Sequence, residues 1–446
     1  MDPDLLQKRR QKFAWYFFGI VSLSYLMVYF HRVAPAVVSD LLMAEFNLSG
    51  AVLGNLAAIY FYVYTLMQLP AGVLADGVGA KKTVFWGMMI SGLGSLIFAA
   101  SSILAFAYLG RILIGFGVSV IFVSMLKIVT EWFPEKKFGT LSGTALFVGN
   151  SGAVLAATPL AYLVSLWGWR VSFTLVGFVG IFAGILTLLL VKDRPSELNL
   201  PSPNPTVKSA ARMGVKDVIQ GLGTVMKNPN SWPPFAVFFG IYGSLMAFQG
   251  VWGLPFLVQQ YGMERFEASS YLLIIAVGLV IGCPTVGYIS DRIGKRKVPL
   301  LTSSLMYALC WVAMLAWPGG KPAPLVLPVL LFAMGFFASG FILLWGCAKE
   351  VNPIEFSGCA IGLANMGGFF GAAILQPLFG WALDKRWLGL VEEGVRIYPL
   401  EAWRFAFLLA LGILISTTLI GVLIKEPKQK TFESRREIRQ YQATKA

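Results

Sequence analysis

The sequence has little charge and a single histidine. Only 13% of its 446 residues are Asp, Glu, Lys or Arg. A soluble domain carries roughly twice that fraction, so the composition excludes an ordinary soluble protein. One histidine, and no acid deep inside any apolar run, leave little equipment for acid–base chemistry. A membrane enzyme is disfavoured for the same reason.

Cysteine is also scarce, and its spacing does not indicate a metal site. The four cysteines lie in or beside apolar stretches of the second half: Cys283, Cys310, Cys347 and Cys359. We interpret them as packing residues and expect no metal and no cofactor. The phosphate loop G-x-x-x-x-G-K-[ST] is missing as well, which argues against ATP-driven work.

Long apolar runs dominate what is present. Hydrophobic residues make up 57% of the chain, and the mean hydropathy is +0.71. Backbone groups in lipid must be hydrogen-bonded internally, and continuous runs of about 20 residues suit helices and not alternating barrel strands. We therefore expect an all-α membrane protein with twelve spans. They are predicted near residues 14–42, 50–75, 83–102, 104–130, 139–164, 170–191, 233–260, 268–289, 298–317, 323–348, 358–383 and 402–424.

A polar, proline-containing stretch divides the chain after the sixth span. It predicts an N-terminal six-helix bundle over 1–192, a cytoplasmic linker over 193–231, and a C-terminal six-helix bundle with a short cytoplasmic tail over 232–446.

The distribution of basic residues predicts the orientation in the membrane. With the N-terminus in the cytoplasm, the cytoplasmic segments receive 26 Lys and Arg residues and the outer segments 7. This bias predicts a multi-pass protein of the inner (plasma) membrane with both termini cytoplasmic.

The basic residues form short clusters between apolar runs, so the net charge of +14 does not indicate a nucleic-acid partner.

One such basic cluster is duplicated: the turn within residues 72–82 is similar in sequence to the turn within residues 287–297. Seven identities also recur at a single offset of 219, including Glu131 with Glu350 and Gly149 with Gly368. A parallel repeat of this kind predicts two related bundles that face each other across a pathway, as in a transporter.

The duplicated G-x-L-x-D-x-x-G-x-x-x loop resembles that of the major facilitator superfamily. The resemblance covers almost the whole chain and implies twelve helices in two six-helix bundles related by a pseudo-two-fold, around a central cavity. The first copy has Gly77 where the family usually has Arg, whereas the second keeps Arg292. In the family this loop latches the cytoplasmic side. The resemblance therefore implies gating roles for Asp76, Lys81, Lys82, Asp291, Arg292 and Arg296, with Glu131 and Glu350 as acidic partners.

Arg32 is the most informative charge inside a span. A guanidinium remains charged and fits carboxylate, sulfonate or phosphate with two parallel hydrogen bonds. With no acid nearby in the spans, we expect it to bind an anionic substrate; snorkelling or binding to helix carbonyls is the alternative. His31 is the only deep side chain that titrates near neutral pH and could carry a coupling proton. A neutral, hydrogen-bonded histidine is the alternative there.

Aromatic and polar residues are expected to line the rest of the pocket. Tyr25, Tyr29 and Arg32 are spaced to share one helical face. The other candidates are Tyr60, Tyr64, Gln249, Trp252 and Asn365, with Tyr242 on the same span as Gln249. Packing is the alternative for each of them, but together they suit a half-polar cavity for a small solute.

Two segments resemble the anion:cation symporter group, which moves sugar acids and other organic anions. The segment Tyr29–Arg32 is similar to its first-helix Y-x-D-R, and Arg111–Gly115 with Lys127–Pro134 is similar to its fourth-helix stretch. That resemblance implies a role for Arg111 in proton coupling or cavity structure. The chain departs from the group where His31 replaces the proton-binding Asp and Val118 replaces an acid.

The sequence thus predicts a secondary active transporter of a small anionic organic solute, working by alternating access with proton-coupled uptake. We expect a monomer in the lipid bilayer. A nitrate carrier, another small-solute carrier or a drug exporter of the same fold remains an alternative. So does a receptor-like membrane protein that binds its ligand without transporting it.

Overall fold

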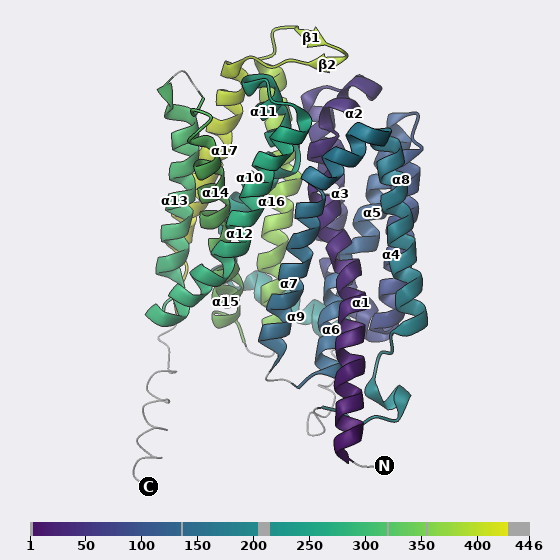
Figure 1. Ribbon diagram of the computed structural model, residues 1–446. Coiled ribbons are helices and arrows are strands. Elements are labelled where there is room, and N and C mark those ends of the chain that lie inside the picture. The colour runs from purple at the N-terminus through teal and green to yellow at the C-terminus, as the bar shows by residue number, and fades with distance from the viewer. Residues whose placement is uncertain (1–2, 135–136, 204–214, 319–320, 354–355, 427–446) are drawn as a thin grey trace.

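The computed structural model describes residues 3–134, 137–203, 215–318, 321–353 and 356–426, and most of them form long helices along one common axis (Figure 1). The elements are α1 (Pro3–Val37), α2 (Ser39–Phe46), α3 (Gly50–Gly77), α4 (Ala80–Ala99), α5 (Leu104–Ser119), α6 (Ile121–Trp132), α7 (Phe138–Leu155), α8 (Thr158–Leu190), η2 (Pro195–Leu198), α9 (Val215–Lys227), η3 (Pro229–Ser231), α10 (Trp232–Ala247), η4 (Phe248–Trp252), α11 (Gly253–Tyr261), α12 (Arg265–Ile293), α13 (Lys297–Ala316), α14 (Leu327–Ala338), η6 (Ser339–Ile342), α15 (Leu343–Glu350), α16 (Ser357–Lys385), β1 (Val391–Glu392), β2 (Val395–Arg396) and α17 (Leu400–Gly421).

Eleven stretches of the described residues are long and apolar enough to cross a membrane. One of them, Thr140–Leu190, has 51 residues. As a single helix it would be about 76 Å long, more than twice the roughly 30 Å of a bilayer core. Gly168 interrupts it with a φ of 76°, a left-handed conformation that favours glycine. This stretch therefore crosses twice, and the twelve predicted spans are confirmed.

Individual boundaries differ from the prediction. The first span was expected to reach residue 42, but α1 ends at Val37 and the chain turns into the separate short helix α2. The all-α expectation also needs a small correction, because β1 and β2 form a two-stranded antiparallel hairpin before α17. These departures lie at one end of the bundle and leave the twelve-helix plan unchanged.

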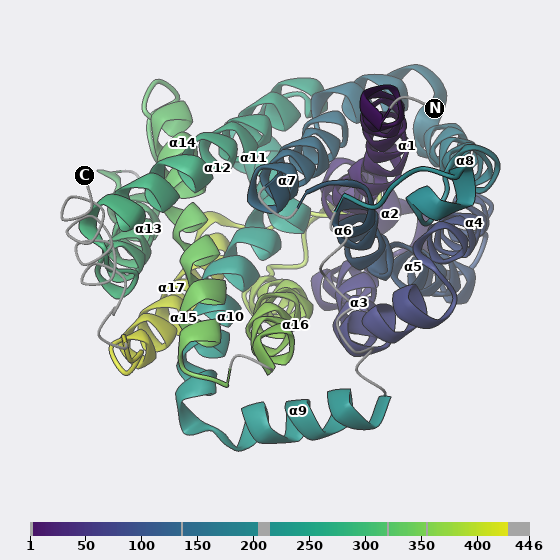
Figure 2. The same ribbon diagram turned by 90° about the horizontal axis from the view of Figure 1, so that it is seen from below.

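Seen along the bundle axis, α1–α8 form one half and α10–α17 form the other, with α9 at the rim of the bundle, where it runs past α16 from the α10 side toward α3 (Figure 2). This is the predicted two-bundle arrangement. The residue limits proposed for the halves and the linker stay a prediction, since part of the linker (204–214) and the tail (427–446) lie outside the described residues. We call the end with α9 and the start of α1 the basic end, and the end with α2 and β1–β2 the hairpin end.

The two halves approach closely at the hairpin end, where α3 meets α16. A Cβ atom on Gly380 would lie 2.1 Å from the Gly50 carbonyl oxygen, and one on Gly54 would lie 2.5 Å from the Gln376 carbonyl oxygen. Small residues thus allow backbone-to-backbone contact between helices of different halves.

Polar links join the halves at the same end. The two carboxylate oxygens of Asp384 accept hydrogen bonds from the Gly50 and Ala51 amides at 2.9 and 2.8 Å. These amides begin α3, and a helix N-terminus favours a negative charge. Arg265 of α12 forms an ion pair with Asp40 of α2 at 2.6 Å. The hairpin end of the bundle is therefore closed.

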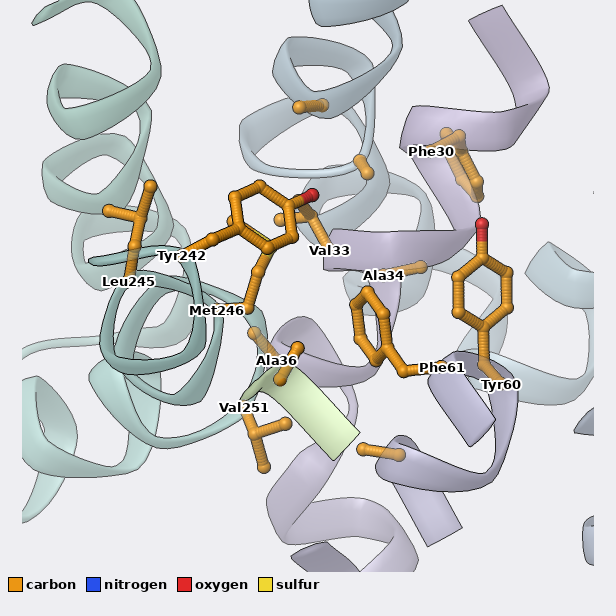
Figure 3. Packing of buried hydrophobic residues seen from close by; sticks show 14 of the residues in the cluster. Phe30, Val33, Ala34, Ala36, Tyr60, Phe61, Tyr242, Leu245, Met246 and Val251 are labelled. Atoms are coloured by element: carbon orange, nitrogen blue, oxygen red, sulfur yellow. The ribbon is translucent and has the colours of Figure 1, made fainter. Parts of the chain in front are cut away.

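Apolar packing continues from this end into the middle of the molecule. Figure 3 shows Tyr242 and Met246 of α10 facing Val33 and Ala36 of α1, with Phe61 of α3 beside them. All five side chains are buried, with at most 6% of their surface exposed. The layer separates the hairpin end from the space described next.

Candidate functional site

A cavity of about 680 Å³ lies between the two halves. Its wall comes from α1, α7, α10, α12 and α16, with η4, η6 and α15. The lining residues are Tyr29, Arg32, Val33, Ser142, Gly143, Thr144, Leu146, Phe147, Asn150, Ala153, Phe238, Tyr242, Met246, Gln249, Ala276, Leu279, Val280, Cys283, Pro284, Phe341, Ile342, Trp345, Asn365 and Phe369.

The cavity extends toward the basic end. Ser142 lies in the first turns of α7 and Asn365 is near the start of α16, two helices that begin at that end. Toward the hairpin end, the crevice between Ala36, Ala157 and Leu272 has no room for a water molecule. A solute in this conformation would therefore reach the cavity from the basic end.

Arg32 lies in the cavity wall with 4% of its surface exposed. Its Nη1 donates a hydrogen bond to the Tyr242 hydroxyl at 3.3 Å. The rings of Tyr29, Tyr64 and Phe369 lie 4.3, 5.0 and 4.9 Å from the guanidinium carbon. Aromatic faces attract a cation without neutralising it, so this surrounding holds the guanidinium in place and leaves its charge available.

No acid pairs with this guanidinium within the described ranges. The ion pairs found there are Arg170–Glu45, Arg265–Asp40, Arg296–Glu350 and Arg396–Asp384. The Nε atom of Arg32 is buried and has no hydrogen-bond partner. A buried cation with unused donor capacity is costly unless an anion arrives. The binding of a solute by Arg32 stays a prediction, but its surroundings agree with it.

His31 points away from the cavity. It is 1% exposed, it does not line the cavity, and its ring contacts Phe30 edge-on at 5.8 Å between ring centres. Its Nδ1 is buried without a hydrogen-bond partner. Since neighbours on a helix diverge by about 100°, His31 and Arg32 face different surroundings. The expected alternative of a hydrogen-bonded histidine is not seen at Nδ1.

Arg111 also lies outside the cavity lining, and its role in the structure is to connect three helices. Its nitrogens donate to the carbonyl oxygens of His31, Leu56 and Ala57 at 3.2, 3.4 and 3.1 Å. Its guanidinium carbon is 5.2 Å from the centre of the Tyr60 ring. These contacts favour the structural part of the role that the resemblance implied, and a part in proton coupling stays a prediction.

The remaining pocket candidates divide into two groups. Tyr29, Gln249 and Asn365 line the cavity, and Asn365 donates to the Gln68 side chain across the two halves at 3.3 Å. Tyr64 contacts Arg32 without lining the cavity.

The other three candidates are packing residues. Tyr25 stacks on Phe122 at 5.1 Å between ring centres, and the Tyr60 hydroxyl donates to the Val28 carbonyl at 3.1 Å. Trp252 donates to the Gln376 carbonyl at 2.9 Å. In this conformation these three residues pack against other protein groups, and a part in binding the solute stays a prediction.

The duplicated basic turns bind acids of their own halves. The Lys81 amide donates to Asp193 at 2.7 Å, and the amide of Arg296 donates to Glu426. The side chain of Arg296 also pairs with Glu350, one of the two acidic partners that the resemblance implied, at 2.6 Å. Each loop is thus fixed to the segment that follows the last span of its half.

The other gating candidates are placed as follows. The side chain of Asp76 lies outside the described residues. Lys82, Asp291 and Arg292 are exposed, and Glu131 is half-buried with no ion pair in the described part of the chain. The predicted gating roles therefore remain predictions.

Sequence reasoning missed several residues that matter here. Phe369 lies four residues after Asn365 and therefore on the same helical face, a spacing that pointed to it. Asp193 and Glu426 close the similar segments Val-Lys-Asp and Ile-Lys-Glu after the sixth and twelfth spans, a second echo of the repeat. No sequence pattern pointed to Asp384, because its partners in the other half are backbone amides distant in sequence.

Among the described residues no group of acids, histidines and cysteines could hold a metal.

Comparisons with known proteins agree with this geometry. The sequence model of the Major Facilitator Superfamily matches residues 17–376 and 253–444. The probable galactarate/D-glucarate transporter GarP of Escherichia coli is 27% identical over 401 residues, covering 80% of this chain and 85% of the relative. The probable sulfoacetate transporter SauU of Cupriavidus necator is 24% identical over 437 residues, covering 96% and 99%.

Solved structures show the same fold. A bacterial homologue of the human lysosomal transporter Spinster superposes with a TM-score of 0.73 at 16% identity, covering 94% of this chain and 99% of that one. The nucleoside transporter NupG superposes with a TM-score of 0.71 at 15% identity, covering 92% and 99%. With a family match along the chain and relatives that are named as transporters and not as enzymes, the chain belongs to the Major Facilitator Superfamily.

Proposed function

We propose that the protein is a secondary active transporter that takes up a small anionic organic solute, with Arg32 as the anion-binding residue. The observation that carries this proposal is a guanidinium in the cavity wall without a protein acid in the described ranges. The relatives named for galactarate or glucarate and for sulfoacetate support an anionic cargo. The charge bias supports an inner-membrane location with the basic end in the cytoplasm.

Alternating access is the proposed mechanism. The hairpin end is held shut by Asp384 on the start of α3 and by the Arg265–Asp40 pair, while the cavity extends toward the basic end. In the proposed orientation this is an inward-facing conformation. Uptake requires that these links break and that the basic end close, with the duplicated turns as its latch.

For coupling, we propose that a proton travels with the solute and that His31 carries it. His31 adjoins Arg32, and its Nδ1 has no hydrogen-bond partner in this conformation, so the atom is available to a proton once it is reachable. Its ring does not line the cavity in this conformation, so the proposal requires that His31 become reachable when the hairpin end opens.

The experiment is a thermal-shift titration with organic acids on the purified protein and on Arg32→Gln. We expect stabilisation by anions in the wild type and its loss in Arg32→Gln, because the counter-charge is gone. Arg386→Gln, which removes an exposed arginine at the hairpin end, is the matched control. Equal stabilisation of all three proteins would remove Arg32 from the site. Accumulation in proteoliposomes then separates a transporter from a receptor, which binds without accumulating its ligand.

A further inference from the structure

We propose that the cavity selects a solute with one negative charge and an apolar body about the size of a ring, and that it discriminates against dianions and polyhydroxylated acids. This inference rests on the proposed function, because it defines the substrate class of the same Arg32 site. It depends on three observations: the number of charges in the wall, the apolar character of most other lining residues, and the donors that some of the polar lining residues have already used.

The first observation is the charge count. Among the described residues that line the cavity, Arg32 is the single charged side chain. It can neutralise one carboxylate or sulfonate. A second anionic group on the same solute would lie in the cavity with no counter-charge, and an unpaired buried charge is strongly disfavoured.

The second observation is the chemistry of the rest of the wall. Apolar and aromatic residues make up most of the lining beyond Arg32, on α12, η6, α15 and α7. They include Leu279, Val280, Phe341, Trp345 and Phe147. A wall of this kind favours removal of an apolar group from water and offers few partners to a hydroxyl.

The third observation concerns hydrogen bonds. Three of the polar lining residues already use their donors within the protein. Asn150 donates to the Leu146 carbonyl at 2.9 Å and Thr144 to the Thr140 carbonyl at 3.0 Å. Asn365 donates to Gln68. Other lining groups keep hydrogen-bonding capacity, since Ser142 Oγ and Trp345 Nε1 have no partner. A sugar acid would still bring several hydroxyls that each lose water partners, more than these few groups can replace.

Three anions of similar size separate these requirements: benzoate has one charge and an apolar ring, terephthalate has two charges on the same ring, and gluconate has one charge and five hydroxyls. Their dissociation constants are measured with the full-length protein in lipid nanodiscs. We expect benzoate to bind at least about tenfold more tightly than either of the others, a typical discrimination for one mismatched group in a pocket. Arg32→Gln should abolish benzoate binding, and Arg32→Lys should weaken it while keeping the order.

Cys283 gives an independent readout of where the anion binds. It lines the cavity, whereas the other three cysteines are buried. In a variant that keeps Cys283 alone, saturating benzoate should slow alkylation by N-ethylmaleimide several-fold. An unchanged rate, with benzoate demonstrably bound, would place the anion outside the cavity and overturn the inference.

The outcomes distinguish the inference from the proposal beneath it. If terephthalate or gluconate binds as tightly as benzoate and does so through Arg32, the substrate class is wrong and the anion site stands. If none of the three binds, or if binding survives in Arg32→Gln, both the substrate class and the proposed function are overturned.

Discussion

Replacing Asp384 with asparagine should open the hairpin end. The carboxylate of Asp384 accepts hydrogen bonds from the Gly50 and Ala51 amides of the other half at 2.9 and 2.8 Å. Within its own half it accepts from Tyr398 at 2.9 Å and from Arg396 at 3.1 Å. Of these four bonds, only the two to Gly50 and Ala51 must break when the halves separate at this end. The contribution of Asp384 to the closed state therefore comes from these two bonds.

The magnitude follows from those two bonds. Hydrogen bonds to a charged group contribute about 1.5–3 kcal/mol each, and the helix N-terminus adds a few tenths. Because the Asp384 side chain is 19% exposed, we take the contribution of each bond near the lower limit of this range. The side chain of asparagine has one oxygen that can accept from one of the two backbone amides. Its NH2 group, itself a donor, would face the other amide and could not accept from it. We therefore expect the closed state to lose about 2–3 kcal/mol, a shift of roughly 30- to 150-fold toward the open state.

Tyr398 should remain a neutral hydrogen-bond donor throughout this comparison. Burial raises the pKa of its hydroxyl well above the ordinary value, and the Asp384 carboxylate raises the same pKa further. A raised pKa keeps the neutral, donating form at every pH used for transport assays. Changes of pH should therefore not imitate the effect of the Asp384 substitution through Tyr398.

Spin labels measure the result directly. Ala44 of α2 and Glu267 of α12 are exposed and lie on opposite halves. With cysteines at these two sites and the native cysteines replaced, double electron–electron resonance reports the separation of the halves at the hairpin end. We expect a second, longer distance in Asp384→Asn and none in the control Glu392→Gln, an exposed acid of the hairpin. A distance distribution equal to that of the parent would refute the assignment of Asp384 as a latch.

Three further predictions concern coupling, packing and stability. His31→Gln should abolish uptake driven by a pH gradient in proteoliposomes while counterflow exchange of the same solute survives; retained concentrative uptake would exclude His31 as the proton carrier. Gly380→Val should prevent closure of the hairpin end, because even a Cβ there meets the Gly50 carbonyl at 2.1 Å, and the label pair above should show the longer distance. Gly358→Val, where a Cβ meets nothing within 4 Å, should behave as the parent does. Arg111→Met should lower stability by about 3 kcal/mol, seen as a lower melting temperature, since three buried carbonyls lose their donor; Arg404→Met, which removes one 3.4 Å bond, should cost much less, and equal losses would contradict the account.

The architecture could be predicted from sequence because its cause is local. Apolar runs of membrane-spanning length, basic clusters between them, and the repeated turn each act within about 30 residues of chain. Gly168 fell in the predicted gap between two spans, and its left-handed backbone is what turns one apolar stretch into two crossings. For Arg32 the sequence left two kinds of partner open, an anionic solute or helix carbonyls, and the binding of a solute stays a prediction.

The partners of the site residues could not be predicted, because helix rotation and long-range contacts decide them. A helical face is set by where its neighbours pack, so Tyr29 and Arg32 line the cavity while Tyr25, spaced on the same face, packs against Phe122. Arg111 and Arg32 look equivalent in the sequence. Arg111 donates to three backbone carbonyls, whereas Arg32 contacts aromatic faces and lines the cavity. Only the folded arrangement distinguishes these two environments.

The duplicated turns and the hairpin-end links act on different interfaces, and this difference bears on the mechanism. In this conformation the amides of Lys81 and Arg296, equivalent positions of the two copies, both bind an acid at the end of their own half. They make each half rigid without joining the two. The bonds from Asp384 to α3 and the ion pair of Arg265 with Asp40 join the halves at the opposite end. Beside the cavity, two longer hydrogen bonds, Arg32 to Tyr242 and Asn365 to Gln68, also cross between the halves, each at 3.3 Å. Rigid halves whose ion pair and charged hydrogen bonds lie at the hairpin end can rock about the cavity that holds Arg32. We propose that closure of the basic end uses surfaces other than the amides already bound, and that the exposed side chains of Lys82, Asp291 and Arg292 supply them.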